Sequence, residues 1–327
     1  YGQLGNGTTA TTMVPTTVIG LGEGVVQISA GGYHACALMN SGAVMCWGFN
    51  YRGLLGAGEM MNSYSAPIAV NGLSDPVLAI RSGGYHTCAL MVTGGVKCWG
   101  DNEYGQLGNG AYLYTMTPED VTGLSSGVAQ LSCGTRHTCA VMSGTGAVKC
   151  WGRNDKGQVG DLSTVNRQAP VDVLGLDGAA TMVAAGFDST CAVVSGSVRC
   201  WGANTYGGLG DGTTVDRLLP VTVVGLTQVA TIGVGAQGAC ALLSGGGVKC
   251  WGRNSAGQLG NGLFSDSFVP VDVLGMQSGV TRITTKPSPH SCAVLDKGGA
   301  KCWGNNVLGE LGNGNAVTTA IPVDVVW

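Results

Sequence analysis

A tripeptide that returns at a nearly constant interval constrains this chain more than any other feature of its sequence. Cys-Trp-Gly occurs six times, and successive copies lie about 50 residues apart. A prolyl landmark runs with the same period, at Pro15, Pro67, Pro118, Pro170, Pro220, Pro270 and Pro322. Because these registers cover residues 1–327 without a linker, we interpret the chain as a single repeat domain.

Each repeat is composed of segments that are typical of β-strands. Residues 25–48 contain a β-rich stretch, a glycine pair and two runs of alternating side chains around a turn at residues 40–42. Such runs indicate a hairpin. The segment that follows the hairpin, exemplified by residues 105–110, is too rich in glycine for a helix, and a short strand around the next proline comes after it. Four strands in about 50 residues match the size of a propeller blade, so we predict an all-β fold.

Three motifs within the repeat resemble those of the RCC1 repeat family. They stand here as residues 84–90 (Gly-Tyr-His-Thr-Cys-Ala-Leu), 95–102 (Gly-Val-Lys-Cys-Trp-Gly-Asp-Asn) and 105–110 (Gly-Gln-Leu-Gly-Asn-Gly). The resemblance covers essentially the whole chain and implies an RCC1-like β-propeller with four-stranded blades, usually seven of them. It implies no single activity, because the family includes exchange factors for a small GTPase, photoreceptors, β-lactamase inhibitors and secreted proteins of unknown role.

The two halves of the repeat do not occur equally often. The half-unit with Gln-Leu-Gly-Asn-Gly and the proline occurs seven times, in whole or variant form, whereas the Cys-Trp-Gly half-unit occurs six times. We predict seven blades, one of which lacks three strands in this sequence. Three explanations stay open: the sequence is part of a longer protein, the propeller has six blades and an extra strand, or a neighbouring molecule completes an incomplete blade. The last would permit self-association, because unpaired strand edges recruit other chains and head-to-tail contacts build filaments.

Twelve of the thirteen cysteines form six local pairs, each flanking the turn of a hairpin. The pairs are Cys36–Cys46, Cys88–Cys98, Cys139–Cys150, Cys191–Cys200, Cys240–Cys250 and Cys292–Cys302. Residues that face each other on antiparallel strands reach disulfide distance after a small adjustment. Zinc is a poorer interpretation, because one hairpin supplies only two of the four ligands that a structural zinc site needs. Reduced, buried thiols are the other alternative. We predict six disulfides and no metal site.

Disulfides persist in oxidising compartments, so we expect a secreted, extracellular or cell-surface protein from the disulfide-containing branch of the family. Cys133 is the cysteine left over, and it stands where two other repeats have Ala30 and Ala185. We expect a small buried thiol at this position. A reactive thiol or an intermolecular bridge is the alternative.

Charge and hydropathy argue against binding to nucleic acid and against a membrane-spanning segment. The formal net charge is −3, only 11% of the residues are charged, and no run of Lys or Arg is present. Proteins that bind nucleic acid need a basic face to displace counterions from phosphates, so we expect no nucleic-acid partner. No apolar run approaches the roughly 20 residues that cross a bilayer, so we expect no membrane span.

No group of residues points to catalysis or to a cofactor. The four histidines stand two residues before the first cysteine of a hairpin, and this recurrence indicates a structural hydrogen-bonding position: they are His34, His86, His137 and His290. Four aspartates recur before a valine and are expected to be solvated: they are Asp120, Asp172, Asp272 and Asp324. The glycine-rich loop lacks the Lys-Ser/Thr ending of a phosphate loop. We predict a chain that is not an enzyme and binds no cofactor.

Function is expected where the repeats differ from one another. Three loops depart from the pattern and carry aromatic, Met or Leu side chains, namely residues 51–64, 111–116 and 263–268. Their similar register predicts that they lie on one face, where exposed aromatics serve as interface anchors; the alternative is that they pack over blade edges. The candidate interface residues are Tyr51, Arg52, Met60, Tyr64, Tyr112, Tyr114, Phe264 and Phe268.

These expectations combine into a secreted, disulfide-stabilised propeller that acts as a rigid, non-catalytic protein-binding module for an unidentified protein partner. A structural subunit of an extracellular assembly or filament is the first alternative. An exchange factor for a small GTPase, or an inhibitor protein, is a weaker alternative that rests on family analogy alone.

Overall fold

The computed structural model describes residues 1–60, 63–285 and 289–326. The internal contacts of the chain divide it into two compact units. Unit 1 comprises residues 1–10, 16–155 and 165–173, and unit 2 comprises residues 11–15, 156–164 and 174–327. The interpretation of residues 1–327 as one domain therefore stays a prediction.

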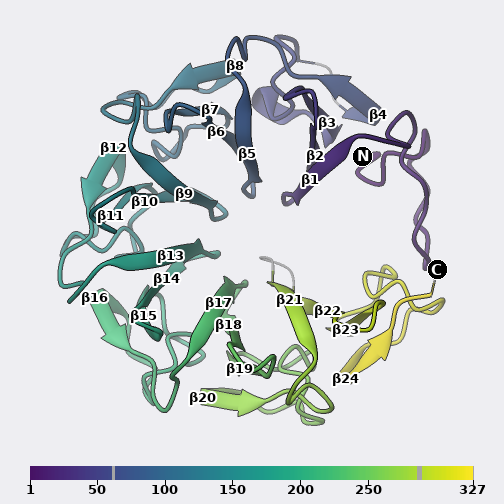
Figure 1. Cartoon of the computed structure of the whole chain (residues 1–327), viewed down its shortest axis with the longest axis vertical. Helices are drawn as coiled ribbons and strands as arrows, with labels where there is room; N and C mark the ends of the chain where they lie inside the picture. The colour runs from purple at the N-terminus through teal and green to yellow at the C-terminus, as the bar shows by residue number, and fades with distance from the viewer. Residues whose placement is uncertain (61–62, 286–288, 327) are drawn as a thin grey trace. The chain divides into compact units, whose positions relative to one another are not determined.

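Unit 1 contains three four-stranded antiparallel sheets, which we call blades 1 to 3 (Figure 1). Blade 1 consists of β1(Val25–Ala30), β2(His34–Met39), β3(Val44–Phe49) and β4(Ser63–Ala69). Blade 2 consists of β5(Val77–Ser82), β6(His86–Met91), β7(Val96–Gly100) and β8(Thr115–Asp120). Blade 3 consists of β9(Val128–Cys133), β10(His137–Met142), β11(Val148–Gly152) and β12(Arg167–Asp172).

Unit 2 contains three sheets of the same kind, blades 4 to 6. Blade 4 consists of β13(Ala180–Ala185), β14(Ser189–Val194), β15(Ser197–Gly202) and β16(Arg217–Thr222). Blade 5 consists of β17(Val229–Val234), β18(Gly238–Leu243), β19(Val248–Gly252) and β20(Ser267–Asp272). Blade 6 consists of β21(Val280–Thr285), β22(His290–Leu295), β23(Ala300–Gly304) and β24(Thr319–Asp324).

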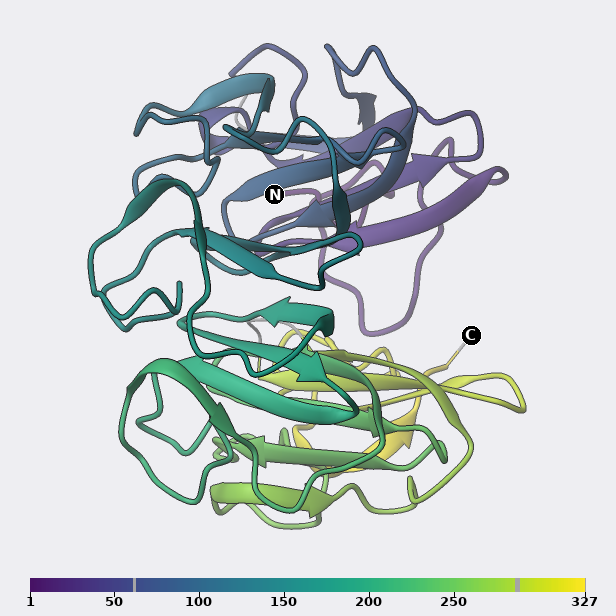
Figure 2. The ribbon, with the colours of Figure 1, turned by 60° about the vertical axis from the view of Figure 1, so that its left-hand side comes forward.

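The strands of a blade pair in chain order, and burial differs among them. In blade 2 every residue of β6 is buried, whereas every residue of β8 is at least partly exposed. The apolar runs on either side of the hairpin turn therefore form the interior of a blade, and the strand with the proline forms an exposed edge. Figure 2 gives a second view, in which each blade is a small twisted sheet of its own.

One disulfide closes the hairpin between the second and third strands of every blade. The two cysteines face each other in the strand register, as Cys88 and Cys98 do between β6 and β7. Their Cα atoms lie 4.0–4.1 Å apart in all six bridges, which are Cys36–Cys46, Cys88–Cys98, Cys139–Cys150, Cys191–Cys200, Cys240–Cys250 and Cys292–Cys302. In the chain-entropy account, closing a loop of this size stabilises the fold by roughly 2–3 kcal/mol.

The tryptophan of each Cys-Trp-Gly tripeptide fastens its blade to a loop that lies 43–45 residues earlier in the sequence. In all six copies the indole Nε1–H donates to a backbone carbonyl of that loop at 2.9–3.1 Å. In blade 2, Trp99 bonds to Leu54, and Gly56 lies against the same indole with a φ of 73°. A Cβ at Gly56 would come within 2.7 Å of the indole nitrogen, so this loop needs glycine there.

The prediction of seven blades is wrong, because the described residues form six four-stranded blades, three in each unit. Each Cys-Trp-Gly half-unit pairs with the strand that contains the next proline. The first proline, Pro15, lies instead in a segment without regular structure. Residues 1–7 form the loop that receives Trp47, whose indole donates to the Gln3 carbonyl at 3.0 Å. The surplus half-unit is thus the loop that fastens blade 1, and no blade among the described residues is left incomplete.

Helical structure in the described part of the chain is one turn, η1(Tyr51–Gly53). The equivalent segments of the other repeats form turns through glycines with positive φ, such as Gly105 at 83° and Gly108 at 71°. Over the same residues, no helix is both long enough and apolar enough to cross a membrane.

Candidate functional site

Two loops of each blade meet at one edge of the sheet and present side chains that vary among the repeats. One loop precedes the second strand, and the other follows the third. In blade 1 the Phe49 N–H donates to the Tyr33 carbonyl at 2.9 Å, and in blade 2 the Asp101 N–H donates to the Tyr85 carbonyl at 2.9 Å. Gly48 permits this approach, because its φ is 104° and a Cβ there would lie 2.6 Å from the Tyr33 oxygen.

A buried asparagine anchors the loop that follows the third strand. In blade 2 the Asn102 side-chain oxygen accepts a hydrogen bond from the Leu107 N–H at 3.0 Å. Its amide nitrogen donates to the carbonyls of Ala111 and Leu113, both at 3.0 Å. Because one side chain bonds to both ends of the loop, it helps to hold the residues of that loop in place.

In unit 1 this edge carries a connected run of aromatic rings, which we call the aromatic strip: it comprises Tyr1, Tyr33, Phe49, Tyr51 and Tyr85. Tyr33, Tyr51 and Tyr85 lie in these loops, whereas Phe49 ends β3 and Tyr1 lies in the segment before β1. Tyr33 contacts Tyr1, Phe49 and Tyr85 with ring centroids 5.9–6.2 Å apart. Phe49 lies 4.5 Å from Tyr1 and stacks on Tyr51 at 6.0 Å. Tyr1, Tyr33 and Tyr51 are 58%, 41% and 47% exposed. Contiguous exposed apolar surface is a candidate interaction site.

Arg52 stands at one end of the aromatic strip and is held by several contacts at once. Its guanidinium lies 5.0 Å from the Tyr51 ring centroid and 5.9 Å from that of Tyr114. It also forms an ion pair with Asp101, and this hydrogen bond raises the pKa of Arg52. The Arg52 backbone has a φ of 54°, a left-handed conformation that costs a non-glycine residue about 1–2 kcal/mol. The contacts of the side chain offset that cost.

Arg136 lies at the other end, between two tyrosines. Its guanidinium is 5.4 Å from the Tyr85 ring centroid and 4.9 Å from that of Tyr104, and it donates to the Tyr104 hydroxyl at 2.9 Å. Burial, followed by the neighbouring Tyr33, raises the pKa of Tyr85. Arg153 lies 5.6 Å from the same Tyr104 ring. Among the ion pairs of the described residues, such as Arg52–Asp101 and Arg153–Asp155, none includes Arg136.

The equivalent loops of unit 2 are chemically different. Arg253 lies 4.9 Å from the Tyr206 ring centroid, which reproduces the stacking of Arg153 on Tyr104. The residue at the Tyr33 position is Asp188 in blade 4 and Gln237 in blade 5. These side chains, with Lys156 and Tyr206, line a hollow of about 300 Å³. Unit 2 therefore presents a polar hollow where unit 1 presents aromatic rings.

The eight residues expected at an interface are distributed over both units. Three of them, Tyr51, Arg52 and Tyr114, lie together at the end of the aromatic strip. Met60 and Tyr112 are 59% and 51% exposed. Tyr64, on β4, donates to the Glu59 carboxylate at 2.7 Å, and that bond raises the pKa of Tyr64.

The remaining two candidates, Phe264 and Phe268, belong to unit 2 and are 55% and 42% exposed. Phe268 covers the backbone of Gly207, where a Cβ would come within 2.4 Å of its ring. Phe268 therefore packs on a neighbouring blade edge, which was the alternative considered for these loops. That all eight residues serve one interface stays a prediction.

Most of the aromatic strip was not anticipated from the sequence. Tyr1, Tyr33, Phe49 and Tyr85 occupy positions beside the glycines, the histidine or the Trp-Gly of the repeat, and these positions were treated as part of the repeat pattern. The sequence does contain a signal for these positions, because the residue before the recurring histidine position varies among the repeats. It is aromatic or Arg in blades 1 to 3 but Asp or Gln in blades 4 and 5.

Two of the recurring histidines, His34 and His86, connect neighbouring blades within unit 1. His86 Nε2 lies 2.8 Å from the Thr138 hydroxyl, which donates to the Gln106 carbonyl at 2.9 Å. The same carbonyl accepts the Trp151 indole N–H at 2.9 Å. The Thr138 hydroxyl has one proton, and it donates that proton to the Gln106 carbonyl. The hydroxyl can therefore only accept from His86, so the proton of the neutral imidazole is on Nε2. Burial lowers the pKa of His86 to about 3, which keeps the ring neutral. This is a structural role, repeated by His34, Thr87 and Leu54.

The recurring aspartates are exposed, as expected, and each faces a lysine on the third strand of its blade. Lys97 and Asp120 are 2.8 Å apart, and Lys149 and Asp172 are 2.6 Å apart. The same pairs recur in unit 2 as Lys249–Asp272 and Lys301–Asp324. Exposed pairs of this kind contribute little, about 0–1 kcal/mol each.

Comparison with known proteins places these features in a family. The family model of the RCC1-like domain matches residues 1–326. Human HERC4, a probable E3 ubiquitin-protein ligase, is 35% identical over 178 residues, which is 54% of this chain and 17% of HERC4. The ultraviolet-B receptor UVR8 of Arabidopsis thaliana is 35% identical over 185 residues, which is 55% of this chain and 42% of UVR8. The alignments thus span less than half the length of these relatives.

Solved structures show the same fold. Prp20p from Saccharomyces cerevisiae matches with a TM-score of 0.88 at 22% identity, over 100% of this chain and 84% of Prp20p. Human WBSCR16 matches with a TM-score of 0.84 at 25% identity, over 94% of this chain and 83% of WBSCR16. With the repeat, the fastened tryptophans and the four-stranded blades, these matches lead to one conclusion: the chain belongs to the RCC1-like domain family.

Proposed function

We propose that the chain is a secreted, non-catalytic protein-binding module that binds its partner through the aromatic strip of unit 1. The observation that carries the proposal is the contact between five exposed or half-buried rings, from Tyr1 to Tyr85, in blades 1 and 2 and in the segment before β1. Tyr and Arg are the side chains most enriched among residues that dominate binding energy. The strip therefore has the composition of an interface centre.

The scaffold beneath the strip favours binding without rearrangement. Each contributing hairpin is closed by a disulfide, and each blade is fastened by a tryptophan. Side chains on such loops lose little conformational freedom when they bind, which reduces the entropic cost of association. This supports a rigid module over one that folds around its partner.

Arg136 suggests one feature of the partner. Its guanidinium is stacked between Tyr85 and Tyr104, so the planar fork is held in one orientation. A fork held in this way favours bidentate binding of a carboxylate. The proposed partner therefore presents an Asp or Glu side chain, or a chain terminus, beside an apolar segment that covers the tyrosines.

The six disulfides support a secreted or extracellular location, because such bonds persist in oxidising compartments. A thiol count tests this part of the proposal. Protein isolated from its natural source, denatured without reductant and alkylated, should take up one equivalent of reagent. Uptake of thirteen equivalents would contradict the oxidised state and the proposed location.

The binding surface is tested with two matched variants. Y33A/Y85A/R136A removes the centre of the strip, whereas Y206A/R253A removes the equivalent stacked pair of unit 2. Each immobilised protein is exposed to the same extracellular fluid from the natural source, and bound proteins are quantified by mass spectrometry. A true partner should be recovered about tenfold less on the first variant, since hot-spot losses exceed 1.4 kcal/mol, and equally on the second. Equal recovery on both variants would refute the strip as the binding surface.

Relatives support protein binding in general without identifying a partner. One solved complex holds yeast RCC1 (Prp20) bound to Kap60, and the Prp20p study describes binding to Gsp1p and histones. At 21% and 22% identity these matches support the fold alone, so a role in small-GTPase exchange has no observation of its own in this chain. The self-assembly alternative rested on an incomplete blade, whereas each of the six described blades has four strands.

A further inference from the structure

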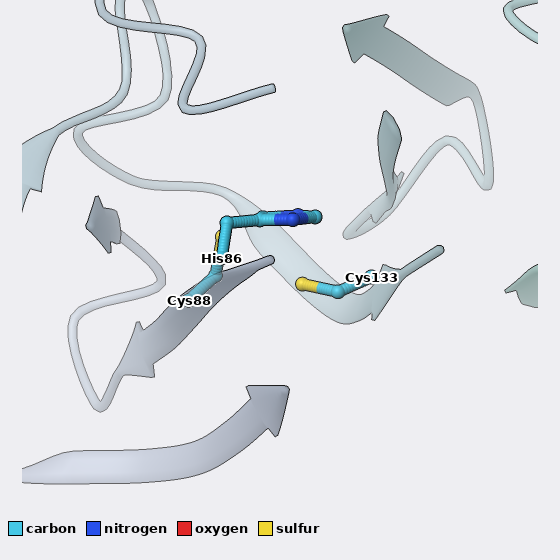
Figure 3. Close-up of side chains that lie close together, drawn as sticks. All are labelled: His86, Cys88 and Cys133. Carbon is cyan, nitrogen blue, oxygen red and sulfur yellow. The ribbon is translucent and has the colours of Figure 1, made fainter. Parts of the chain in front are cut away.

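A group of three polar or reactive side chains lies between blades 2 and 3. His86 and Cys88 belong to β6, and Cys133 is the last residue of β9. One imidazole nitrogen and the two sulfur atoms all lie within 4.8 Å of one another. Figure 3 shows the Cys133 sulfur directed towards the other two side chains.

The arrangement does not suit a metal ion. Cys88 is bonded to Cys98, so its sulfur has no thiolate to offer. Two donors remain, and structural zinc sites need four. The same bond gives the cluster a different reactivity, because a disulfide sulfur is the electrophile that a thiolate attacks.

Cys133 is the cysteine that the six bridges leave as a thiol. It is partly buried and packs against the core cluster that contains Cys88 and Cys98. Blades 1 and 2 have Ala30 and Ser82 at the equivalent end of their first strands. Cys133 therefore places a third sulfur beside a disulfide, whereas Ala30 and Ser82 place none at the equivalent positions.

The surroundings favour a reactive thiol. Burial lowers the pKa of the nearby Arg81, and the attraction of Cys133 opposes that shift. The positive charge of Arg81 favours the thiolate, which is the attacking form. His86 stays neutral, and its Nδ1 is buried without a hydrogen-bond partner. It can accept a hydrogen bond from a thiol in the cluster, which a positively charged ring could not do.

We propose that Cys133 is the attacking thiol of an internal thiol–disulfide exchange with the Cys88–Cys98 bridge. The Cys133 thiolate attacks the Cys88 sulfur, a Cys88–Cys133 bond forms, the Cys88–Cys98 bond breaks, and the Cys98 thiolate takes up the proton that Cys133 released. One thiol and one disulfide exist before and after the step, so no oxidant or reductant is needed.

The exchange converts a bridge within one hairpin into a bridge between two blades. A disulfide is about 2.05 Å long, so the Cys88 and Cys133 sulfurs must approach from at most 4.8 Å by side-chain rotation. The product joins β6 of blade 2 to β9 of blade 3 and leaves Cys98 as the thiol. The chain thus has two covalent forms of identical mass.

Peptide mapping of the full wild-type chain tests the proposal. The protein is held at neutral pH, quenched in acid to stop exchange, unfolded, labelled with maleimide and digested with pepsin without reduction. We expect label on both Cys133 and Cys98, and peptides bridged through both Cys88–Cys98 and Cys88–Cys133. Label on Cys98 should exceed the background of C133S at least about tenfold. Label on Cys133 alone, with Cys88–Cys98 as the sole bridge of Cys88, overturns the proposal.

Two further variants test whether the sulfurs can meet. C98S leaves Cys88 and Cys133 as thiols, and oxidised glutathione should convert them into a Cys88–Cys133 bridge. C46S is the matched control: it leaves Cys36 as a thiol, and the position equivalent to Cys133 is then Ser82. Cys36 in this variant should carry glutathione and form no internal bridge. Glutathione on both Cys88 and Cys133 of folded C98S counts against the proposal, and if C98S does not fold, the wild-type map decides alone.

Discussion

Thr138→Val is the substitution that best tests how neighbouring blades are held together. The Thr138 side chain is fully buried on β10 and lies between two partners from the preceding blade region. It accepts a hydrogen bond from His86 Nε2 at 2.8 Å and donates one to the Gln106 carbonyl at 2.9 Å. Valine has nearly the same shape but no hydroxyl, so the change removes the hydrogen bonds and leaves the packing almost intact.

The expected loss follows from which groups are left without a partner. His86 Nε2–H becomes a buried, unsatisfied donor, which costs about 1–3 kcal/mol. The Gln106 carbonyl keeps its bond from the Trp151 indole, so the second lost bond costs only its net value of about 0.5–1.5 kcal/mol. The added methyl group offsets less than about 0.8 kcal/mol. We therefore expect the free energy of unfolding to fall by about 2–3 kcal/mol.

Urea denaturation of the disulfide-intact protein measures this change, provided that the slope with denaturant stays constant. Thr87→Val removes the equivalent hydroxyl between His34 and Leu54 and should cost a similar amount. Thr122→Val, at an exposed position, should stay within about 0.5 kcal/mol of the wild type. If Thr138→Val and Thr122→Val unfold at the same midpoint, the histidine–threonine connection contributes nothing and the reasoning fails.

Two further predictions concern pH and one glycine. Burial lowers the pKa of both His86 and His137 to about 3, against an ordinary value of 6.5. Between these two pH values the histidines gain protons only when the protein unfolds. The free energy of unfolding should therefore be constant above pH 6.5 and fall below it by up to about 1.4 kcal/mol per pH unit per histidine. Urea midpoints at pH 7.5, 6 and 4.5 measure this, and an unchanged midpoint contradicts the buried neutral state. Gly108→Ala should cost well over about 1 kcal/mol, because φ is +71° and a Cβ would lie 2.6 Å from Trp151 Nε1. Gly123→Ala has a similar φ of +72° and nothing within 4 Å, so its smaller loss measures the backbone cost alone, and equal losses would argue against the contact with the indole.

Features that depend on residues close in sequence could be predicted well. The all-β repeat follows from alternating side chains around glycine turns, and the pairing of cysteines across each hairpin is a local matter of register. Cys88 and Cys98 face each other because the turn between them has the right length. The blade number was predicted wrongly, because the role of residues 1–7 depends on a contact with Trp47 that lies 44 residues away from Gln3. Counting half-units does not reveal which of them forms a strand and which forms a loop.

The candidate site was predicted only in part for a similar reason. Tyr51, Arg52 and Tyr114 stood out because their loops depart from the repeat. Tyr33 and Tyr85 did not stand out, because they follow glycines within the repeat motif. That their rings meet, 5.9 Å apart, depends on how blade 1 packs against blade 2, and no local pattern reports that distance. Comparing each repeat position across all copies would have shown that these two positions vary.

The direction of the tryptophan hydrogen bonds implies that the segment duplicated during evolution of this protein is not the blade. Each indole donates to a carbonyl 43–45 residues earlier, so the accepting loop always lies outside the sheet that contains the tryptophan. A segment cut at the edges of one sheet carries a tryptophan without the loop that accepts its hydrogen bond, so the bond forms only where the neighbouring sheet supplies an equivalent loop. A segment that runs from one glycine-rich loop to the next tryptophan carries both members of the bond and can be inserted whole. Gene rearrangements that change the number of repeats should therefore have their boundaries inside a sheet, before the fourth strand, rather than between sheets.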